Sequence, residues 1–232
     1  MRALKKLFML LTLSLCAGLV LASADKPQNG VDYNTLAKPQ PTDAGKKIEV
    51  IEFFGYFCPH CHALDPSLTE WVKKQGDKIV FKRVHVLFDP RMLPIQQTYV
   101  TLELMGKTEE VHKKIFDALH KQRLRLDTPE ALLEFVTRQG GIDKQKYLDV
   151  YNSFSVQTKL RRSAQLLEAY GINSVPQLFV DGRFQTSPDL MHNSLGAQAS
   201  EATLHAATMK TLDNLVEMVS RERQAGEGGK KK

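Results

Sequence analysis

The feature that most limits how this chain can fold is an apolar run that leads into a closely spaced cysteine pair. Residues 48–54 are largely β-branched and aromatic, which is typical of a central strand covered on both faces. Gly55 then allows a turn, and Cys58 and Cys61 follow three residues apart. Pro59, between them, is favoured in the first turn of a helix, where its missing N–H is not needed. The pattern predicts a strand, a turn and a helix that begins at Cys58.

The segment after this unit changes from a strand pattern to a helical one. A second strand is expected at residues 79–86, and apolar residues at helical spacing dominate from about residue 94 to residue 170. Within this block Asp127 is expected to cap a helix, with Glu130 reaching back to the cap. The length of the block predicts a separate group of helices inserted into an α/β domain.

Strand character returns near the end of the chain. Residues 177–180 are apolar, and Asp181 and Gly182 then form the dipeptide with the strongest hairpin signal, so residues 183–186 are expected to form the return strand. A final amphipathic helix is expected over residues 201–223. The fold class predicted from this order is α/β, with one domain interrupted by an all-α insertion.

The amino terminus has the pattern of an export signal. Arg2, Lys5 and Lys6 precede an apolar stretch at residues 7–21, and small residues follow at 22–24. We expect the first 24 residues to be cleaved off. An uncleaved anchor is the alternative, but the apolar stretch is shorter than the roughly 20 residues that a spanning helix needs.

Two further inferences depend on this leader. Lipid attachment at Cys16 is a third reading of it, ranked below simple cleavage because Leu15 is bulky where such a site needs a small residue. Removal of the leader lowers the formal charge from +6 to +3, which is too mild to favour nucleic acid or an anionic membrane as a partner. We therefore expect an exported globular protein of about 208 residues that binds no nucleic acid.

Loss of the leader also leaves Cys58 and Cys61 as the only cysteines. An exported chain with one such pair has no disulfide framework, so the pair is present for reactivity or for metal binding. Half of a zinc site and an inert structural disulfide are the alternatives. Structural zinc commonly takes two separated pairs of ligands, and no second cysteine pair exists, so we expect redox chemistry, no metal and no cofactor.

The expected helix start gives the two cysteines different chemistry. A thiolate on Cys58 at the N-cap would accept hydrogen bonds from the N–H groups of His60 and Cys61 and would lie at the positive end of the helix dipole. A protonated His60 would stabilise it further. Cys58, at an exposed helix start, is expected to be the sulfur that a substrate thiolate attacks, and the more buried Cys61 is expected to resolve the mixed disulfide.

Other residues gave open alternatives. Pro176 is either an ordinary proline at a strand start or a cis proline beside the cysteines that leaves backbone groups free to pair with a peptide. Glu52 either faces solvent or is buried near Cys61 with a raised pKa, where it could pass a proton. Phe57 is expected in the core or at the border of a substrate surface. His62 and His85 are expected at the surface or as hydrogen-bonded core residues.

Residues 52–61, together with Val175 and Pro176 before the strand at 177–180, resemble the DsbA family of bacterial periplasmic disulfide oxidases in the thioredoxin superfamily. The short strand of that family is matched by residues 33–39, and the helical block lies where the family has its helical insertion. A histidine at position 62, where an aromatic residue stands in the best-known member, leaves the chemistry intact and puts the redox potential in question.

The resemblance implies a thioredoxin fold with an inserted helical domain and assigns roles to single residues. It implies that Cys58 is the nucleophile, Cys61 its buried partner, Pro59 and His60 the dipeptide that tunes them, Pro176 a cis proline and Glu52 a buried glutamate. Together with the export signal at 1–24 and the polar, glycine-rich residues 226–232, which are expected to form a disordered tail, the regions expected are thioredoxin-fold parts at 25–90 and 166–225 and a helical domain at 91–165.

The function implied is donation of the Cys58–Cys61 disulfide to newly exported proteins in the periplasm. The expected partners are reduced exported polypeptides and an inner-membrane, quinone-linked oxidase of the DsbB type, and the expected state is a monomer. A reductase or isomerase on the same fold is the nearest alternative. Against an isomerase, few residues precede the first strands, and Val175 rather than threonine precedes Pro176. A peptide-binding chaperone module is the alternative from another class.

Overall fold

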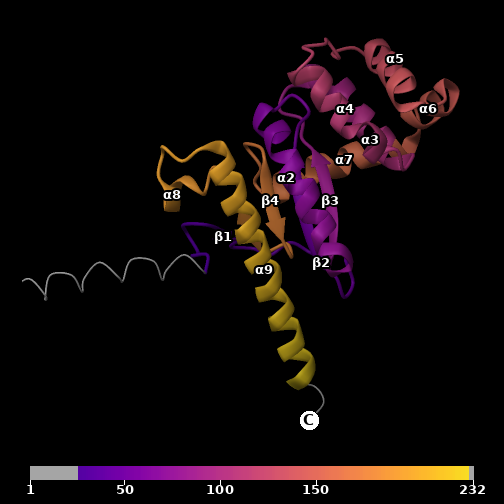
Figure 1. The fold of residues 1–232 in the computed structure, drawn as a ribbon. Helices are drawn as coiled ribbons and strands as arrows, with labels where there is room; N and C mark the ends of the chain where they lie inside the picture. The colour runs from indigo at the N-terminus through magenta and orange to yellow at the C-terminus, as the bar shows by residue number, and fades with distance from the viewer. Residues whose placement is uncertain (1–25, 230–232) are drawn as a thin grey trace, which may run out of the picture.

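The computed structural model describes residues 26–229, so the leader at 1–24 and Cys16 lie outside the described residues. The described part contains one five-stranded mixed sheet with helices on both faces and a group of helices above one end of it (Figure 1). The sheet order is β1-β5-β4-β2-β3, with strand bounds Asn34–Thr35 for β1, Ile48–Phe54 for β2, Ile79–His85 for β3, Gln177–Val180 for β4 and Phe184–Thr186 for β5.

The central strand β2 is buried along its whole length, as its apolar sequence predicts. It pairs in parallel with β3 and antiparallel with β4. Alternate side chains of β2 enter different cores: Ile48 and Val50 face α2 and α9, whereas Ile51 and Phe53 pack with residues of α7. Because Glu52 shares the parity of Val50, its side chain lies on the α2 face of the sheet.

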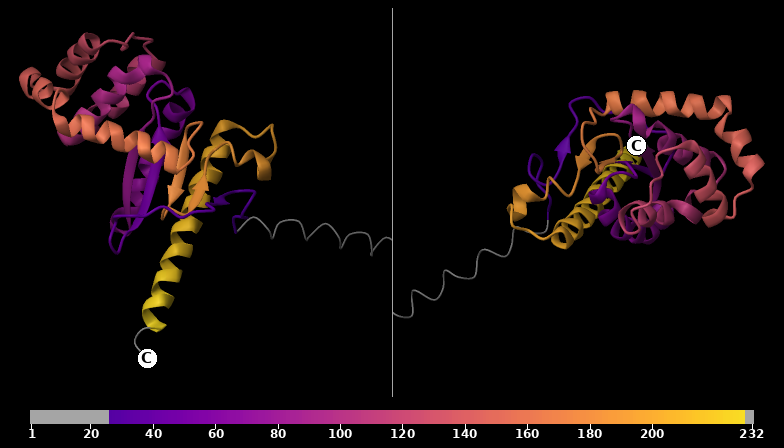
Figure 2. Two further views of the ribbon diagram at one scale, coloured as in Figure 1. Left: turned by 180° about the vertical axis from the view of Figure 1, so that it is seen from behind. Right: turned by 90° about the horizontal axis from the view of Figure 1, so that it is seen from above.

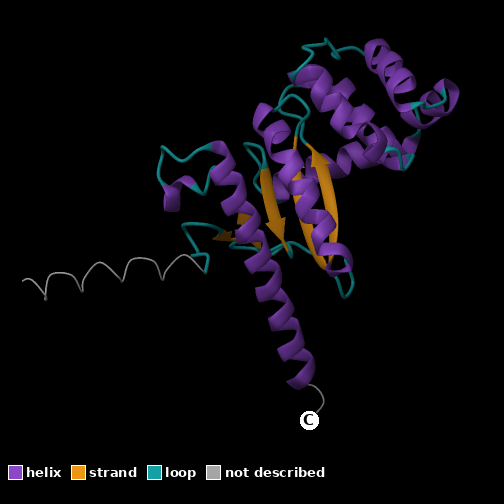
Figure 3. Cartoon of the chain, in the orientation of Figure 1, coloured by secondary structure: helices purple, strands orange, loops and turns teal. Residues whose placement is uncertain are grey.

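Eight α-helices lie within the described residues (Figure 3). Their bounds are Pro59–Gln75 for α2, Leu93–Leu104 for α3, Thr108–His120 for α4, Pro129–Gly140 for α5, Lys144–Tyr151 for α6, Phe154–Ala169 for α7, His192–Leu195 for α8 and Glu201–Gly229 for α9. Short 3-10 turns occupy Gly76–Lys78 and Pro90–Met92. No helix of the described part is both long and apolar enough to cross a membrane.

The helices α3 to α6 form the predicted insertion, and α7 leads back from it to the sheet, as the views from behind and above show (Figure 2). Its core contains Val111, Ile115, Leu132 and Val136, and it continues to the cysteine pair. The α/β fold with a helical insertion is confirmed. The boundary expected at residue 165 falls inside α7, which ends at Ala169, because its last turn carries Leu166 and Leu167 onto the sheet.

Two local predictions about helix ends are wrong. The N-cap of α5 is Thr128, whose side chain accepts the N–H of Ala131, and not Asp127. Asp127 instead pairs with Arg125. The final helix runs to Gly229, so the expected tail at 226–232 begins within α9, and residues 230–232 lie outside the described part.

The hairpin prediction is confirmed in its turn. Asp181 and Gly182 have φ values of 57° and 62° and join β4 to β5. Two consecutive positive φ values match the right-handed twist of the paired strands. A Cβ at Gly182 would also lie 2.2 Å from the Gln40 carbonyl oxygen, so this turn requires glycine for space as well as for its backbone conformation.

Candidate active site

Cys58 and Cys61 occupy the first turn of α2, and both are free thiols. Cys58 is the N-cap residue, Pro59 follows it in the first turn, and the N–H of Cys61 donates to Cys58 Sγ over 3.2 Å. Unpaired N–H groups at a helix start carry partial positive charge. The predicted helix start is confirmed, and it places a polarised sulfur at the positive end of a helix.

The two sulfurs differ in access. Cys58 is 6% exposed and Cys61 is 0% exposed. Cys58 is therefore more enclosed than the exposed helix start that the sequence predicts, and the reason is a loop distant in sequence: the Val175 carbonyl oxygen lies 3.5 Å from Cys58 Sγ and accepts its S–H. Only Cys58 retains contact with solvent, so it is the sulfur that a thiol from outside can reach.

The two thiols also differ in pKa, and the more accessible sulfur, Cys58, has the lower value. The pKa of Cys58 is lowered to about 7, chiefly because the Cys61 thiol donates to its sulfur, with help from the backbone N–H groups of Cys61 and His60 and against the cost of burial. Burial, followed by the interaction with Cys58, raises the pKa of Cys61 far above its ordinary value. As the pH rises through neutrality the reduced pair therefore loses its first proton from Cys58, while Cys61 remains a thiol.

The segment before β4 brings Val175 and Pro176 to the cysteines. The Val175–Pro176 peptide bond is cis, which decides between the two readings that the sequence left open. β4 begins at the next residue, Gln177, and pairs antiparallel with β2, the strand that leads to Cys58. Adjacent strands thus place the loop at residues 174–176 (the proline loop) and the turn at residues 55–58 (the cysteine turn) at the same end of the sheet.

The turn between β2 and α2 depends on Gly55. A Cβ at this position would lie 2.5 Å from the Phe57 ring, so only glycine allows the ring to fold back over the turn. Phe57 is half-buried, and its ring centroid lies 6.4 Å from that of Phe88, which is 44% exposed. Phe57 is thus both a core residue and part of the apolar surface beside Cys58.

Glu52 is buried at 2% exposure on the α2 face of the sheet. Burial raises the pKa of its carboxyl to about 7, although the Arg83 guanidinium opposes the shift by charge and by a 2.8 Å bond from Nε to Glu52 Oε2. Its negative charge in turn helps to raise the pKa of Cys61. Of the two readings of Glu52, the buried one is correct, and the carboxyl titrates in the range where thiol exchange moves protons.

A buried polar network around Glu52 was not predicted from the sequence. Arg83, which lies opposite Glu52 in the β2–β3 register, also binds Asp65 Oδ1 at 3.1 Å. His112 Nε2 lies 3.1 Å from the same oxygen, and His112 Nδ1 lies 2.9 Å from the Tyr56 hydroxyl. The sequence signal was a pair of adjacent cations, Lys82 and Arg83, inside an otherwise apolar strand. The partner of Arg83 could be identified only from the register.

The histidines near the site are held by the backbone of the cysteine turn. His85 Nε2 accepts the N–H of Tyr56 over 3.0 Å, and its Nδ1 donates to the Val86 carbonyl, so it is a hydrogen-bonded core residue whose pKa burial lowers to about 3. His120, in α4, donates to the Tyr56 carbonyl over 2.8 Å and stacks on His62 at 4.9 Å between ring centroids. A hydrogen bond from the helical insertion therefore stabilises the turn that precedes Cys58.

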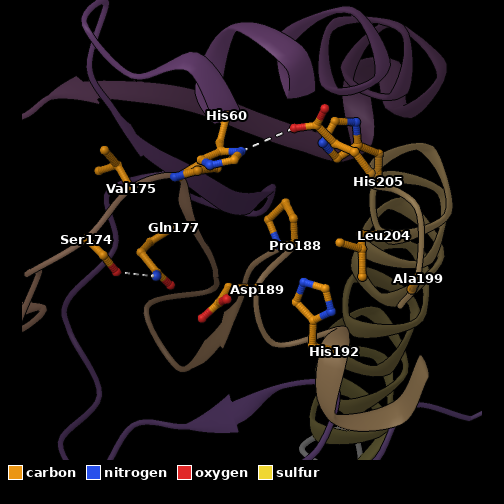
Figure 4. Close-up of a pocket in the computed structure, with 12 residues that line it drawn as sticks. His60, Ser174, Val175, Gln177, Pro188, Asp189, His192, Ala199, Leu204 and His205 are labelled. Atoms are coloured by element: carbon orange, nitrogen blue, oxygen red, sulfur yellow. Dashed lines mark hydrogen bonds and ion pairs between the residues drawn. The ribbon is translucent and has the colours of Figure 1, made fainter. Parts of the chain in front are cut away.

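A groove of about 600 Å³ opens beside the cysteine pair (Figure 4). One side is formed by residues 174–177 and His60, and the other by the segment around Pro188 and by the start of α9. His60 Nδ1 lies 3.2 Å from Glu201 Oε1 across the groove. Neither cysteine lines the groove, but Val175 does, and its carbonyl oxygen lies 3.5 Å from Cys58 Sγ, so a chain lying in the groove passes close to the reactive sulfur.

The described residues place no further metal-binding side chains around the cysteine pair. Within residues 26–229 no group of three or more histidine, cysteine, aspartate or glutamate side chains is arranged to hold a metal ion. Zinc sites in proteins ordinarily use three or four such ligands. The arrangement of donors and acceptors around Cys58 is that of a thiol-exchange site.

Comparison with known proteins places this geometry among proteins of known activity. Residues 49–206 match the family model described as DSBA-like thioredoxin domain. The chain is 42% identical over 212 residues to the thiol:disulfide interchange protein DsbA of Burkholderia cepacia, covering 91% of this chain and 94% of that protein. Its identity to the protein of the same name from Bordetella parapertussis is 37% over 203 residues, covering 88% and 91% of the two chains.

Solved structures give the same relationship. The crystal structure of Pseudomonas aeruginosa DsbA superposes with a TM-score of 0.74 at 33% sequence identity, covering 87% of this chain and 97% of that one. The oxidoreductase NmDsbA1 from Neisseria meningitidis superposes with a TM-score of 0.70 at 29% identity, covering 85% and 96%. The similarity thus extends over the thioredoxin core and the helical insertion together.

Proposed function

The chain belongs to the DsbA family of thioredoxin-fold thiol:disulfide oxidoreductases, and from that premise we propose a role for each residue of its site. The reaction is donation of the Cys58–Cys61 disulfide to exported polypeptides. Its intermediate is a mixed disulfide between Cys58 and the substrate. The observation that carries the assignment is the split acidity of the pair, with a thiolate on the accessible sulfur and a thiol on the enclosed one.

In the first step a substrate thiolate attacks Cys58 Sγ of the oxidised enzyme. The new S–S bond forms between substrate and Cys58, the Cys58–Cys61 bond breaks, and its electron pair leaves on Cys61 sulfur. In the second step another substrate thiolate attacks the substrate sulfur of the mixed disulfide. The substrate leaves oxidised, and Cys58 leaves as the thiolate that the helix start and the Cys61 thiol stabilise. Two electrons pass from the substrate to the enzyme.

Cys61 must take up a proton after the first step, because its enclosed sulfur is a poor site for charge. We assign this proton transfer to Glu52, which is buried on the same face of the sheet and titrates at about 7. Arg83 acts as a positioning residue, since its 2.8 Å bond fixes one oxygen of the Glu52 carboxylate. Pro59 and His60 set the helix start, and His60 supplies a backbone N–H to the Cys58 sulfur.

The substrate surface in this proposal comprises Phe57, Val175 and Pro176. The carbonyl oxygen of Val175 lies 3.5 Å from Cys58 Sγ, and we place the backbone of a bound chain beside it. Family membership also supports a periplasmic location for a mature monomer, with residues 1–24 as the export signal. It supports renewal of the disulfide by an inner-membrane, quinone-linked oxidase of the DsbB type.

The direction of electron flow is tested by equilibrating the reduced protein in glutathione buffers of graded redox potential. An oxidase requires the Cys58–Cys61 couple to be more oxidising than the glutathione pool of the cytosol, whose biochemical potential is about −220 to −260 mV. A couple more reducing than that range would identify a reductase and refute the assignment.

Two variants separate the cysteine roles. With a reduced peptide and the enzyme pre-oxidised by diamide plus a small thiol, the Cys61→Ala variant should accumulate a mixed disulfide at Cys58. The Cys58→Ala variant should form none with the enclosed Cys61. Equal trapping by both variants would contradict the assignment of attack to Cys58. Retention of full biological activity by Cys58→Ala would instead favour a peptide-binding chaperone.

A further inference from the structure

The groove beside Pro176 carries acidic side chains as well as apolar ones. Its apolar lining comes from Val175, Pro176, Pro188, Ala199 and Leu204. The carboxylates of Asp189 and Glu201 also line it, and no lysine or arginine does. A groove with this composition attracts cations when its histidines are neutral.

The two carboxylates differ in how they are engaged. Glu201 faces His60 at 3.2 Å, and both side chains are more than half exposed. Asp189 is exposed, and among the residues the structure describes no side chain forms an ion pair or hydrogen bond with its carboxylate. Figure 4 shows the Asp189 side chain between those of Gln177 and His192. Asp189 therefore offers a negative charge to whatever occupies the groove.

The neighbours of Asp189 make their hydrogen bonds to other groups. Gln177 is occupied by bonds to Ser174 at 3.1 Å and Gln185 at 2.9 Å. His192 uses Nδ1 on the Gly196 carbonyl at 3.1 Å. Burial lowers the pKa of His205, which disfavours its cationic form. Among the described lining residues, His60 faces Glu201, and none forms an ion pair or a side-chain hydrogen bond with the Asp189 carboxylate.

We propose that Asp189 and Glu201 make the groove selective for substrate segments that carry a lysine or arginine near the reacting cysteine, beside an apolar residue. This inference rests on the proposed function, because the groove is lined by His60 and by Val175, whose carbonyl oxygen lies 3.5 Å from Cys58 Sγ. The cationic side chain would pair with Asp189, while the apolar residue packs on Pro188 and Leu204. The alternative occupant, a wholly apolar segment, would leave Asp189 facing an apolar surface without a partner.

The test uses three reduced two-cysteine peptides that are identical except for one residue three positions from the first cysteine: lysine, norleucine or glutamate. Second-order rate constants for their oxidation are measured with the oxidised full-length mature protein at low ionic strength. The lysine peptide should react about three to ten times faster than the glutamate peptide, because exposed charge pairs contribute modestly and are screened by salt. Rates with oxidised glutathione correct for differences in the reactivity of the peptide thiols.

Variants locate the source of the preference. Asp189→Asn should reduce the lysine-to-glutamate ratio about two- to threefold, and the Asp189→Asn/Glu201→Gln double variant should bring it near one. Asp189→Asn is the cleaner single change, because Glu201 also faces His60. Glu168→Gln removes one exposed carboxylate of α7, which does not line the groove, and should leave the ratio unchanged.

The outcomes separate this inference from the proposed function. Equal rates for the three peptides, or a preference that survives the double variant, would overturn the selectivity while leaving the oxidase role intact. Failure to oxidise any peptide would refute the proposed function itself. A preference that disappears with Glu168→Gln would assign it to overall charge and would also overturn the inference.

Discussion

Replacement of Glu52 by glutamine should remove a pH-dependent destabilisation from this protein. The carboxyl is 2% exposed, and its pKa is raised from an ordinary 4.5 to about 7, mainly by burial. A shift of this size is equivalent to about 3 kcal/mol, at about 1.4 kcal/mol for each pKa unit. In the Glu52→Gln variant no ionisation occurs at this position, so the difference between the two proteins isolates the titration of Glu52.

The sign follows from the raised pKa. Between pH 4.5 and about 7 the folded state retains the proton of Glu52 while the unfolded chain has lost it, so the free energy of unfolding falls as pH rises. Below pH 4.5 Glu52 is protonated in both the folded and the unfolded state, so the side chain at position 52 is neutral in the wild type as it is in the variant. Wild type and Glu52→Gln should therefore be of similar stability at pH 4.5, and the variant should be more stable by about 3 kcal/mol at pH 8.

Urea unfolding at pH 4.5, 6, 7 and 8 measures this difference. Trp71, the only tryptophan, is 4% exposed and donates from Nε1 to Asp213 at 2.7 Å, so its fluorescence reports unfolding. Both proteins are kept reduced, so the titration of Cys58 is common to them. Glu168→Gln serves as the control for an exposed carboxylate. Parallel stability curves for wild type and Glu52→Gln from pH 4.5 to 8, or a gap of the opposite sign, would refute the reasoning.

Three further predictions follow from single contacts. The Cys61→Ala variant loses the hydrogen bond that contributes most to the acidity of Cys58, so the pKa of Cys58 should rise above 7 toward 9.0. Thiolate absorbance at 240 nm measures this pKa, and an unchanged value would assign the effect to the helix start alone. Because Thr128 is the N-cap of α5, Thr128→Ala should lower the free energy of unfolding by about 0.5–2 kcal/mol, and Asp127→Ala should lower it by much less. The reverse order in urea titrations would identify Asp127 as the cap. His85→Phe leaves a buried backbone N–H without its acceptor and should cost about 1–3 kcal/mol at pH 8. At pH 5 the cost should be smaller by about 2 kcal/mol, because the pKa of His85 is lowered from 6.5 to about 3 and only the unfolded wild type binds a proton there; an equal cost at the two pH values would refute the lowered pKa.

Much of the fold could be predicted because its signals are local. The buried strand at 48–54, the helix start at Cys58 and the turn at Asp181 and Gly182 each depend on neighbouring residues in the sequence. Helix ends were harder, since two adjacent residues with capping side chains compete. At α5 the proline at 129 follows Thr128 directly and occupies the first turn, which makes Thr128 the cap.

The site was predictable only where its chemistry is carried by adjacent residues. The cysteine pair and its helix start lie within four positions, whereas the carbonyl that encloses Cys58 comes from Val175, 117 residues away. The predicted exposure of Cys58 was wrong for that reason. A parallel register between two strands then decides that Arg83 faces Glu52, and no periodicity in either strand encodes that register.

The same distinction explains why the acidic groove beside the cysteines was not foreseen. Its lining comes from the cysteine turn, the proline loop and the segment before α9, and each of these looks ordinary in the sequence. Asp189 reads as a turn residue after Pro188, and Glu201 as a favourable acid in the first turn of a helix. Only when the chain is folded do both carboxylates border one groove, which His60 and Val175 also line beside Cys58. The residues that perform thiol exchange are therefore concentrated in one short motif, whereas those proposed to select the substrate are dispersed, so a close relative can keep the motif and differ in the groove.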